Sequence, residues 1–196
     1  MKKSTVTRLD ILNKAFSLIY KKGYQTTSID DILATTNVTK GAFYYHFKNK
    51  DVMGKAILDE IVKPNIKKTF ADFLNNSNDP LDNIYNLIHN LLLENDFLEI
   101  QYGCPASNLI QEMTPWNVEF SLTLLELTDT LQQGIIEVIN KGIKDGAIKN
   151  EIVAEQVALF VMSGYWGIRN FGKVYNDNKN YYAYLKELKM YLNNFK

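Results

Sequence analysis

The chain has 196 residues, of which 46% are hydrophobic and 22% are charged, a composition typical of a globular protein and too apolar for a disordered one. Its longest uninterrupted apolar run, 157–162, has six residues, whereas a membrane span requires about 20. The single cysteine, Cys104, excludes an internal disulfide and a cysteine-based metal cluster. No apolar stretch follows the first five residues, so we expect no secretory signal and a cytoplasmic location.

The net charge of +0 is the sum of two unlike parts. Residues 1–55 contain ten Lys or Arg and four Asp or Glu, a net charge of +6, and the remaining residues contain twelve and eighteen, a net charge of −6. A small basic head on an acidic body favours a polyanion as partner of the head. Chance clustering of charge is the alternative.

Apolar residues recur mostly at helical spacing, and alternating strand patterns are rare. In the first predicted helix, Ile11, Ala15 and Ile19 lie on one face, and Gly23 after two lysines is typical of a helix end. A second helix is predicted over 28–36, with Thr27 as its N-cap.

A tight turn at Asn37 precedes a third short helix, for which Thr39 is the predicted N-cap. This helix turns Phe43 and Phe47 inward. Asn49 is suited to cap a fourth helix that continues to about residue 76. Pro64 lies inside it, removes a backbone hydrogen bond and clashes with the carbonyl four residues earlier, so we expect a kink there.

Beyond a break at residues 75–80, the pattern predicts five more helices. They are expected over about 81–91, over 104–113, from Trp116 to near Gly146, from a cap at Asn150 to about residue 171, and over about 181–195. The predicted fold class is therefore all-α with about nine helices.

Two short helices joined by a tight turn form the helix-turn-helix pattern. Its small core would contain Ile29, Ile32, Leu33, Val38, Phe43 and Phe47. The third helix would present the remaining residues outward, where Gly41 lets the backbone approach DNA, lysines meet phosphates, and tyrosines offer a ring and a hydroxyl.

Residues 23–33 and 37–50 closely resemble the N-terminal domain of the tetracycline-repressor family (TetR/AcrR type), over roughly residues 8–52. The resemblance implies a helix-turn-helix DNA-binding domain, 1–49, and a helical ligand-binding and dimerisation domain, 50–196. It also implies a homodimer on double-stranded operator DNA and a small-molecule effector of unknown identity. Repression is the commoner mode of regulation in the family. The sequence does not distinguish a repressor from an activator.

The resemblance assigns DNA contacts residue by residue. Thr27 and Ser28 would touch phosphates, and Lys48 would lie on the backbone beyond the recognition helix. That helix would carry Thr39, Lys40, Gly41, Tyr44, Tyr45 and His46. The alternative for Tyr44 and Tyr45 is that they pack on the domain surface without contacting a base. The alternative for His46 is that it packs against the protein or contacts a phosphate. Where the family commonly has Gly, this chain has Asn37, which tolerates a left-handed backbone.

The body is rich in aromatic residues, which suits a ligand pocket. We expect Trp116, Phe120 and Trp166 to contact a mostly apolar effector and Asn108 to orient it. His89, Gln111 and Glu112 are further polar candidates. A dry aromatic core is the alternative, and a cationic guest is also compatible with the acidic body.

The last two helices are predicted to form a four-helix dimer interface. The residues assigned to it are Ala154, Ala158, Met162, Tyr165, Tyr184, Leu188, Tyr191, Leu192 and Phe195. An enzyme and a helix-turn-helix protein without DNA binding are the competing functions. No metal-ligand spacing, nucleophile elbow or phosphate loop occurs, so we predict no catalytic residue, metal or cofactor.

Overall fold

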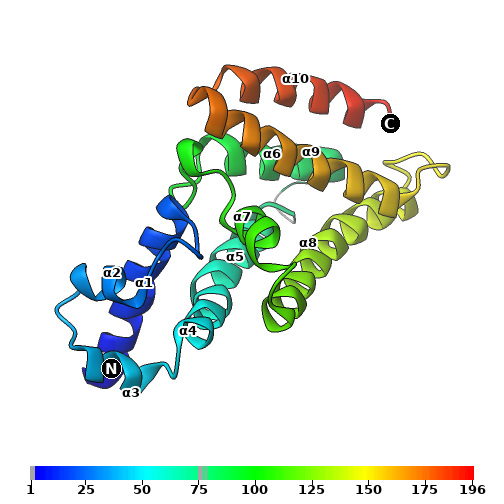
Figure 1. The fold of residues 1–196 in the computed structure, drawn as a ribbon. Helices are drawn as coiled ribbons and strands as arrows, with labels where there is room; N and C mark the ends of the chain where they lie inside the picture. Colours follow the sequence, from blue (N-terminus) through cyan, green and yellow to red (C-terminus); the bar gives the residue numbers. More distant parts are fainter. Residues whose placement is uncertain (1–2, 75–76, 78) are drawn as a thin grey trace. The chain divides into compact units, whose positions relative to one another are not determined.

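The computed structural model describes residues 3–74, 77 and 79–196, with side chains from residue 5 onward. All regular secondary structure in these residues is helical (Figure 1). The elements are α1 (Lys3–Lys22), α2 (Ile29–Ala34), α3 (Lys40–His46), α4 (Lys50–Ile57), the π-helical turn η1 (Leu58–Val62), α5 (Lys63–Leu74), α6 (Pro80–Leu93), the 3-10 turn η2 (Ile100–Tyr102), α7 (Pro105–Met113), α8 (Val118–Lys144), α9 (Ala154–Tyr175) and α10 (Lys179–Asn193). The predicted all-α class is confirmed, and α4, η1 and α5 together correspond to the predicted fourth helix.

The chain forms two compact units that do not follow the predicted boundary at residue 49. Unit 1 contains Met1–Pro64 and Pro105–Glu126, and unit 2 contains Asn65–Cys104 and Leu127–Lys196. The head is therefore compact together with α4, η1, α7 and the first turns of α8. The sequence alone did not indicate that these segments pack together, because about 40 residues separate the two parts of unit 1.

In unit 1, α1 packs against α2, α4 and η1. The predicted inner face of α1 is confirmed, since Ile11 and Ala15 are fully buried and Ile19 is 7% exposed. Phe43 and Phe47 are also buried, with ring centroids 5.7 Å apart. Close-packed apolar side chains of this kind supply most of the stability of short helices, which are marginal in isolation.

The predicted disturbance at Pro64 takes the form of a π-helical turn. The backbone N–H of Lys63 donates to the carbonyl of Leu58, five residues earlier, and Pro64 has no N–H to donate. The single π turn thus absorbs the missing bond without ending the helix. Residues 75, 76 and 78, which include the predicted end of this helix and part of the predicted break, lie outside the described residues.

In unit 2, α10 packs against α6 and α9. The predicted inner face of α6 is confirmed, because Leu81, Ile84, Leu87, Ile88 and Leu91 are all at most 4% exposed. Asp79 caps this helix by accepting hydrogen bonds from the backbone N–H groups of Leu81 and Asp82.

The limits of α9 differ from the prediction at both ends. The helix begins after Val153, which makes no side-chain cap, and not after Asn150. It continues past Phe171 to Tyr175 and ends where Asn176 adopts a left-handed backbone, with φ of 51°. Asn176 thus supplies the left-handed residue that commonly ends a helix.

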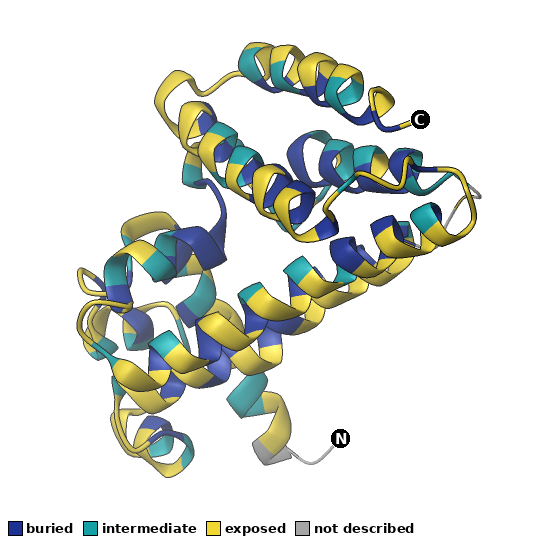
Figure 2. Ribbon diagram, turned by 90° about the vertical axis from the view of Figure 1, so that its right-hand side faces the viewer, coloured by how far each residue is buried: buried dark blue, intermediate teal, exposed yellow. Residues whose placement is uncertain are grey.

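Most residues assigned to a dimer interface are buried inside the single chain, so the assignment is wrong for these residues. The residues that are at most 7% exposed are Ala154, Ala158, Met162, Tyr165, Leu188, Leu192 and Phe195. They are covered because α10 folds back on α6 and α9 within unit 2. The apolar residues of α9 that remain exposed are Leu159, Phe160, Phe171, Val174 and Tyr175. Figure 2 draws exposed positions of the chain in yellow and buried ones in dark blue.

None of the helices in the described part of the chain is long and apolar enough to cross a membrane.

Candidate nucleic-acid interface

The reading unit consists of α2, a turn and α3, and side-chain caps define where both helices begin. Ser28 caps α2: its hydroxyl accepts from the N–H of Asp31 at 3.0 Å, while the Asp31 carboxylate accepts from the N–H of Ser28 at 2.8 Å. This reciprocal pair is a capping box. It also lowers the pKa of Asp31, because the Ser28 hydroxyl and backbone donate to the charged carboxylate. Thr39 caps α3, as predicted, by accepting from the N–H of Ala42 at 3.3 Å.

Thr27 is not the cap, and its side chain is not available to a phosphate. It is fully buried, and its hydroxyl donates to the carbonyl of Gly23 at 2.7 Å. Ser28, next in the chain, is exposed, and its hydroxyl is hydrogen-bonded to Asp31. Asn37 also differs from expectation, because Asn176 is the only non-glycine residue with positive φ in the described residues. The turn before α3 therefore closes without a left-handed residue at position 37.

One face of α3 is free of protein cover. Tyr44 is 46% exposed and Tyr45 is 78% exposed, and a Cβ added to Gly41 would meet no atom within 4 Å. Positions 40, 41, 44 and 45 share this face because residues four apart are neighbours on a helix. The ring of Tyr44 leans edge-on against buried Phe43 at 5.5 Å, and Tyr45 leans edge-on against His46 at 5.0 Å. The two tyrosines thus make ring contacts with neighbouring residues while both side chains stay exposed.

The two predicted phosphate-binding lysines have different surroundings. Lys40 Nζ lies 3.0 Å from the carboxylate of Asp30 on α2. That hydrogen bond raises the pKa of Lys40, and the two other N–H groups of the ammonium remain for further acceptors. Lys48 is exposed, and in the described part of the chain its ammonium makes no ion pair. The partner of Lys40 escaped sequence reasoning, since it depends on how α2 meets α3.

The sequence also gave no sign of the contact between α7 and the turn after α1. Glu112 on α7 accepts from two consecutive backbone N–H groups, those of Tyr24 at 2.9 Å and Gln25 at 2.5 Å. Gly23 precedes them with φ of +95°, and a left-handed residue next to helical ones turns successive N–H groups toward one anion. Gln25 in turn donates from its side chain to the carbonyl of Glu112 at 3.2 Å. Glu112, a candidate effector contact, thus fixes the start of the reading unit to α7.

A second set of contacts in unit 1 surrounds Tyr24. Its hydroxyl donates to Asp51 at 2.6 Å, and Asn117 donates to the other oxygen of Asp51 at 3.2 Å. Burial, followed by the neighbouring Asp51, raises the pKa of the Tyr24 phenol. The ring of Phe120 meets that of Tyr24 at 5.0 Å, and a Cβ on Gly54 would lie 2.5 Å from Phe120. Phe120, predicted to contact an effector, is thus 1% exposed and part of the unit 1 core.

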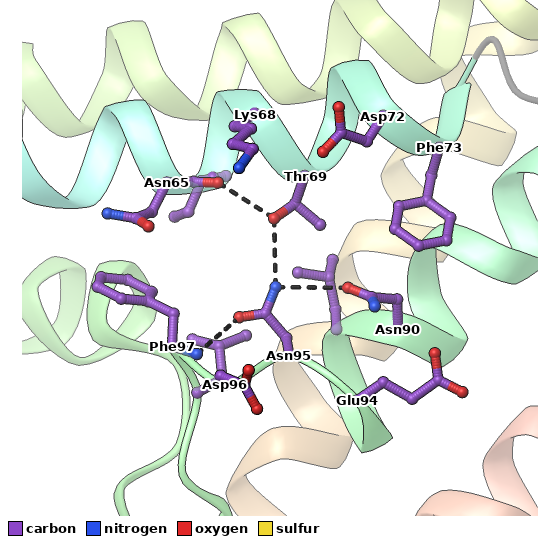
Figure 3. A pocket seen from close by; sticks show the side chains of 13 residues that line it. Asn65, Lys68, Thr69, Asp72, Phe73, Asn90, Glu94, Asn95, Asp96 and Phe97 are labelled. Carbon is purple, nitrogen blue, oxygen red and sulfur yellow. Dashed lines mark hydrogen bonds between the residues drawn. The ribbon is translucent and has the colours of Figure 1, made fainter.

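The other three predicted effector contacts do not share one environment. Trp116 is 78% exposed in the turn before α8. Asn108 on α7 and Trp166 on α9 are half-buried, and they belong to unit 1 and unit 2 respectively. His89 lies 3.4 Å from Glu94 and is partly exposed. None of these residues lines the cavity between α5 and the end of α6 (Figure 3).

Comparison with known proteins agrees with this geometry. Residues 11–57 match the family described as bacterial regulatory proteins, tetR family. An HTH-type transcriptional regulator in the lacX 3′ region of Lactococcus lactis is 37% identical over 131 residues, which cover 67% of each chain. The chain belongs to the tetR family. It is a transcriptional regulator with a helix-turn-helix DNA-binding region, and its relatives are regulators and not enzymes.

Two further relatives extend over more of the chain. The negative transcriptional regulator IcaR of the icaADBC biofilm operon in Staphylococcus epidermidis is 26% identical, covering 87% of this chain and 89% of its own. The crystal structure of a TetR-family regulator from Cytophaga hutchinsonii has a TM-score of 0.89 at 19% identity, and the match covers 100% of this chain and 98% of that one. This structural similarity shows that the two proteins share the same fold along their whole lengths.

Proposed function

We propose that this tetR-family protein is a cytoplasmic, homodimeric repressor that a small molecule releases from a pseudopalindromic operator. The observation that carries the proposal is the uncovered face of α3, on which Lys40, Gly41, Tyr44 and Tyr45 are exposed while Phe43 is buried. A helix with one buried and one open face, preceded by a capped helix and a turn, is suited to the major groove. The relatives named as repressors support repression over activation.

In this proposal, residues 1–49 bind DNA and residues 50–196 bind the effector and dimerise. Ser28, Thr39 and Lys48 contact phosphates, while Tyr44, Tyr45 and His46 approach base edges. Base contacts carry specificity, and phosphate contacts carry affinity and register. The side chain of Thr27 drops out of the predicted set because it is buried.

The proposed dimer surface is the outward face of α9. Phe160, Phe171 and Val174 are 53%, 55% and 78% exposed, and Gly167 lies between them with open space at its Cβ position. Positions 160, 167 and 174 recur every seven residues, so they form one seam. Exposed apolar residues along a seam favour pairing with a second copy, because a two-fold interface uses the same surface twice.

The DNA-binding proposal is tested by gel shift and footprinting on the DNA upstream of the chain's own gene. We expect two protected half-sites about 34–36 Å apart, or a multiple of that, because two-fold heads must meet the groove in register. Tyr45→Ala is expected to weaken operator binding by about 1–3 kcal/mol while leaving binding to unrelated DNA unchanged. Lys48→Ala is expected to flatten the slope of log K against log salt by about one unit. A single asymmetric site, or equal losses on all DNA, would contradict this arrangement.

The dimer proposal is tested by light scattering on Phe160→Asp and Val174→Asp. Both residues are exposed in the single chain, so the variants are expected to fold and to be monomeric at concentrations where the unmodified protein is dimeric. Glu155→Lys, also exposed on α9 but off the seam, is the control. Dimers of unchanged tightness in both variants would place the interface elsewhere.

A further inference from the structure

A cavity of about 290 Å³ lies in unit 2 between α5 and the chain segment that follows α6. Figure 3 shows side chains of α5, of the end of α6 and of residues 95–98 around it. Its volume lies just below the range for small-molecule sites, about 300–1,000 Å³. The occupant suited to this space is therefore a small compound.

Hydrogen bonds tie the two sides of this cavity together. The side-chain amide of Asn95 donates to the hydroxyl of Thr69 on α5 at 3.2 Å, and that hydroxyl donates to the carbonyl of Asn65 at 3.1 Å. The same amide lies 3.4 Å from the side-chain oxygen of Asn90. On the other side of Asn95, its oxygen accepts from the N–H of Phe97 at 3.0 Å. The bond from Asn95 to Thr69 crosses from the segment after α6 to α5 (Figure 3), and the other bonds hold its two ends, so the walls are held before any ligand arrives.

The charge on the walls is negative. Asp72, Glu94 and Asp96 line the cavity, against the single cation Lys68. Glu94 is near His89, at 3.4 Å, whereas the carboxylates of Asp72 and Asp96 make no hydrogen bond or ion pair with the described residues. These two carboxylates can therefore interact with solvent or with a ligand. A cation bound in the cavity would be attracted by both of them.

The remaining walls are apolar or aromatic. Ile66 and Leu91 are buried, and Phe73 and Phe97 are half-buried beside the polar groups. Aromatic faces attract cations and also cover hydrocarbon. A bare metal ion would make no favourable contact with the apolar walls. A small apolar compound that carries an ammonium group can contact the apolar walls with its hydrocarbon part and the acidic walls with its charge.

The position of the cavity along the chain connects it to regulation. Asn65 is the first residue of unit 2, directly after Pro64 at the end of unit 1. The segment that holds Asn95 and Phe97 leads through η2 to Pro105, where the chain returns to unit 1 with α7. A ligand in the cavity therefore contacts Asn65 at one crossing between the units, and a segment that reaches a second crossing about six residues further along the chain. The segment after the second crossing carries Glu112, which binds the turn before α2.

We propose that this cavity binds a small organic ammonium compound and that such binding weakens the hold on operator DNA. The proposal rests on the proposed function for its regulatory half, while the binding half stands on the cavity alone. It places the effector away from the tryptophans and gives it a charge, in contrast to the mostly apolar molecule that the sequence favoured.

The binding half is tested by isothermal titration calorimetry on the full chain. The probes are 2-phenylethylamine, cyclohexylamine and 1,4-diaminobutane, with 2-phenylethanol and cyclohexanol as neutral controls of matched shape. At least one amine is expected to bind, more weakly at high salt, and at least tenfold more tightly than its matched alcohol. Binding of no amine at millimolar concentration, or equal binding of amine and alcohol, would overturn the proposal.

A pair of variants locates the site. The double variant Asp72→Asn, Asp96→Asn keeps the shape of both side chains, removes both charges and is expected to weaken amine binding at least tenfold. The control is Asp145→Asn, Glu151→Gln, which removes two exposed charges of unit 2 outside the cavity and is expected to leave binding unchanged. Since all four positions are exposed, thermal unfolding is expected to be similar in both variants. Equal amine affinity in the two variants would overturn the assignment to this cavity.

The regulatory half is read by gel shift with and without the bound amine. Loss of operator binding with the unmodified protein, and retention with the Asp72→Asn, Asp96→Asn variant, supports it. Amine binding by calorimetry without any effect on operator binding overturns the regulatory half. If only a neutral compound releases the protein from DNA, the effector is not cationic, but the proposed function is still supported. If the protein does not bind DNA at all, the proposed function is refuted, and calorimetry alone tests whether the cavity binds an amine.

Discussion

The two compact units offer one contrast among the contacts that hold their helices together, although both contain rings packed on glycines, as at Gly54 in unit 1. In unit 1, α7 is joined to the turn after α1 by a carboxylate that accepts from backbone N–H groups, through Glu112. In unit 2, α9 and α10 meet through tyrosine rings laid against glycines: Tyr184 against Gly164 and Tyr181 against Gly172. Partly exposed polar contacts exchange with water at small net cost, whereas close packing resists displacement. The contrast predicts that loss of the Glu112 link is tolerated better than an added side chain at Gly172.

The largest effect is expected where a side chain is added to the packed face of unit 2. A Cβ at Gly172 would lie 2.0 Å from the hydroxyl oxygen of Tyr181, a fully buried side chain. Gly172→Ala is therefore expected to lower the free energy of unfolding by about 3 kcal/mol and the melting temperature by roughly 6–12 °C. Thermal unfolding followed by circular dichroism measures both.

The matched control is Gly167→Ala on the same helix. Within the single chain a Cβ there meets nothing within 4 Å, and alanine is the better helix former, so this variant is expected to gain up to about 1 kcal/mol when both glycine variants are made in the Val174→Asp background, which removes the proposed dimer contact. Similar melting temperatures for the two variants would show that α9 and α10 are not closely packed at Gly172.

The next effect concerns the polar link of unit 1. Glu112→Ala removes the acceptor of two backbone N–H groups and is expected to destabilise unit 1 by about 2 kcal/mol, because hydrogen bonds to charged groups contribute about 1.5–3 kcal/mol. Amide hydrogen exchange at Tyr24 and Gln25 is expected to accelerate. Gln111→Ala, at the exposed neighbouring position, controls for the loss of a polar side chain from α7. Unchanged exchange in Glu112→Ala would mean that α7 does not hold this turn.

A smaller effect is expected from the capping box of α2, which lies inside the reading unit. Ser28→Ala removes the acceptor for the N–H of Asp31 and is expected to cost about 1 kcal/mol, measured by urea unfolding. Ser17→Ala, exposed in the middle of α1, is expected to change stability by a few tenths at most. A Ser28→Ala variant as stable as Ser17→Ala would contradict the cap.

The smallest effect tests whether unit 2 contains a polar link of the same kind. Asp79 caps α6 and meets Lys196 at 2.7 Å. Burial opposes ionisation of Asp79, but the hydrogen bonds from Lys196 and from two backbone N–H groups prevail and lower its pKa below the ordinary 3.8. A lowered folded-state pKa contributes stability that is present above pH 3.8 and is lost as the pH falls through the lowered value.

The stability difference between the unmodified protein and Asp79→Asn is therefore expected to be constant from pH 7 to about pH 5 and to shrink below pH 4. Urea unfolding at a series of pH values measures it. A difference that grows on acidification would have the wrong sign for this link.

The local features of the fold were predictable from the sequence because they depend on neighbours along the chain. The buried faces of α1 and α6 follow from apolar residues at helical spacing. The caps at Thr39 and Asn49 follow from a side-chain oxygen placed just before a helix, and both were predicted. The family resemblance gave the reading unit and the residues of its open face.

What the sequence could not supply were contacts between distant segments. Glu112 is an ordinary polar residue of a helix until folding brings it to the turn after Gly23. Arg169 is a further case: its guanidinium is 1% exposed and donates to the carbonyls of Glu99 and Gly103, about seventy residues earlier. The spacing of residues in the sequence does not reveal these hydrogen-bond partners, because they depend on which backbone groups lie near the side chain after folding.

The sequence by itself determined an all-α chain, a basic helix-turn-helix head and the positions of most helices, since periodicity and capping act within a few residues. Only the tertiary structure decided that 105–126 is compact with the head, and that the apolar residues of α9 and α10 are largely used within one chain. It also decided which apolar residues remain for a partner, and which carboxylates line a cavity. The physical reason is that an apolar or charged residue has the same local pattern whether its partner is its own chain, a second copy or a ligand. Burial, which the whole fold sets, distinguishes them.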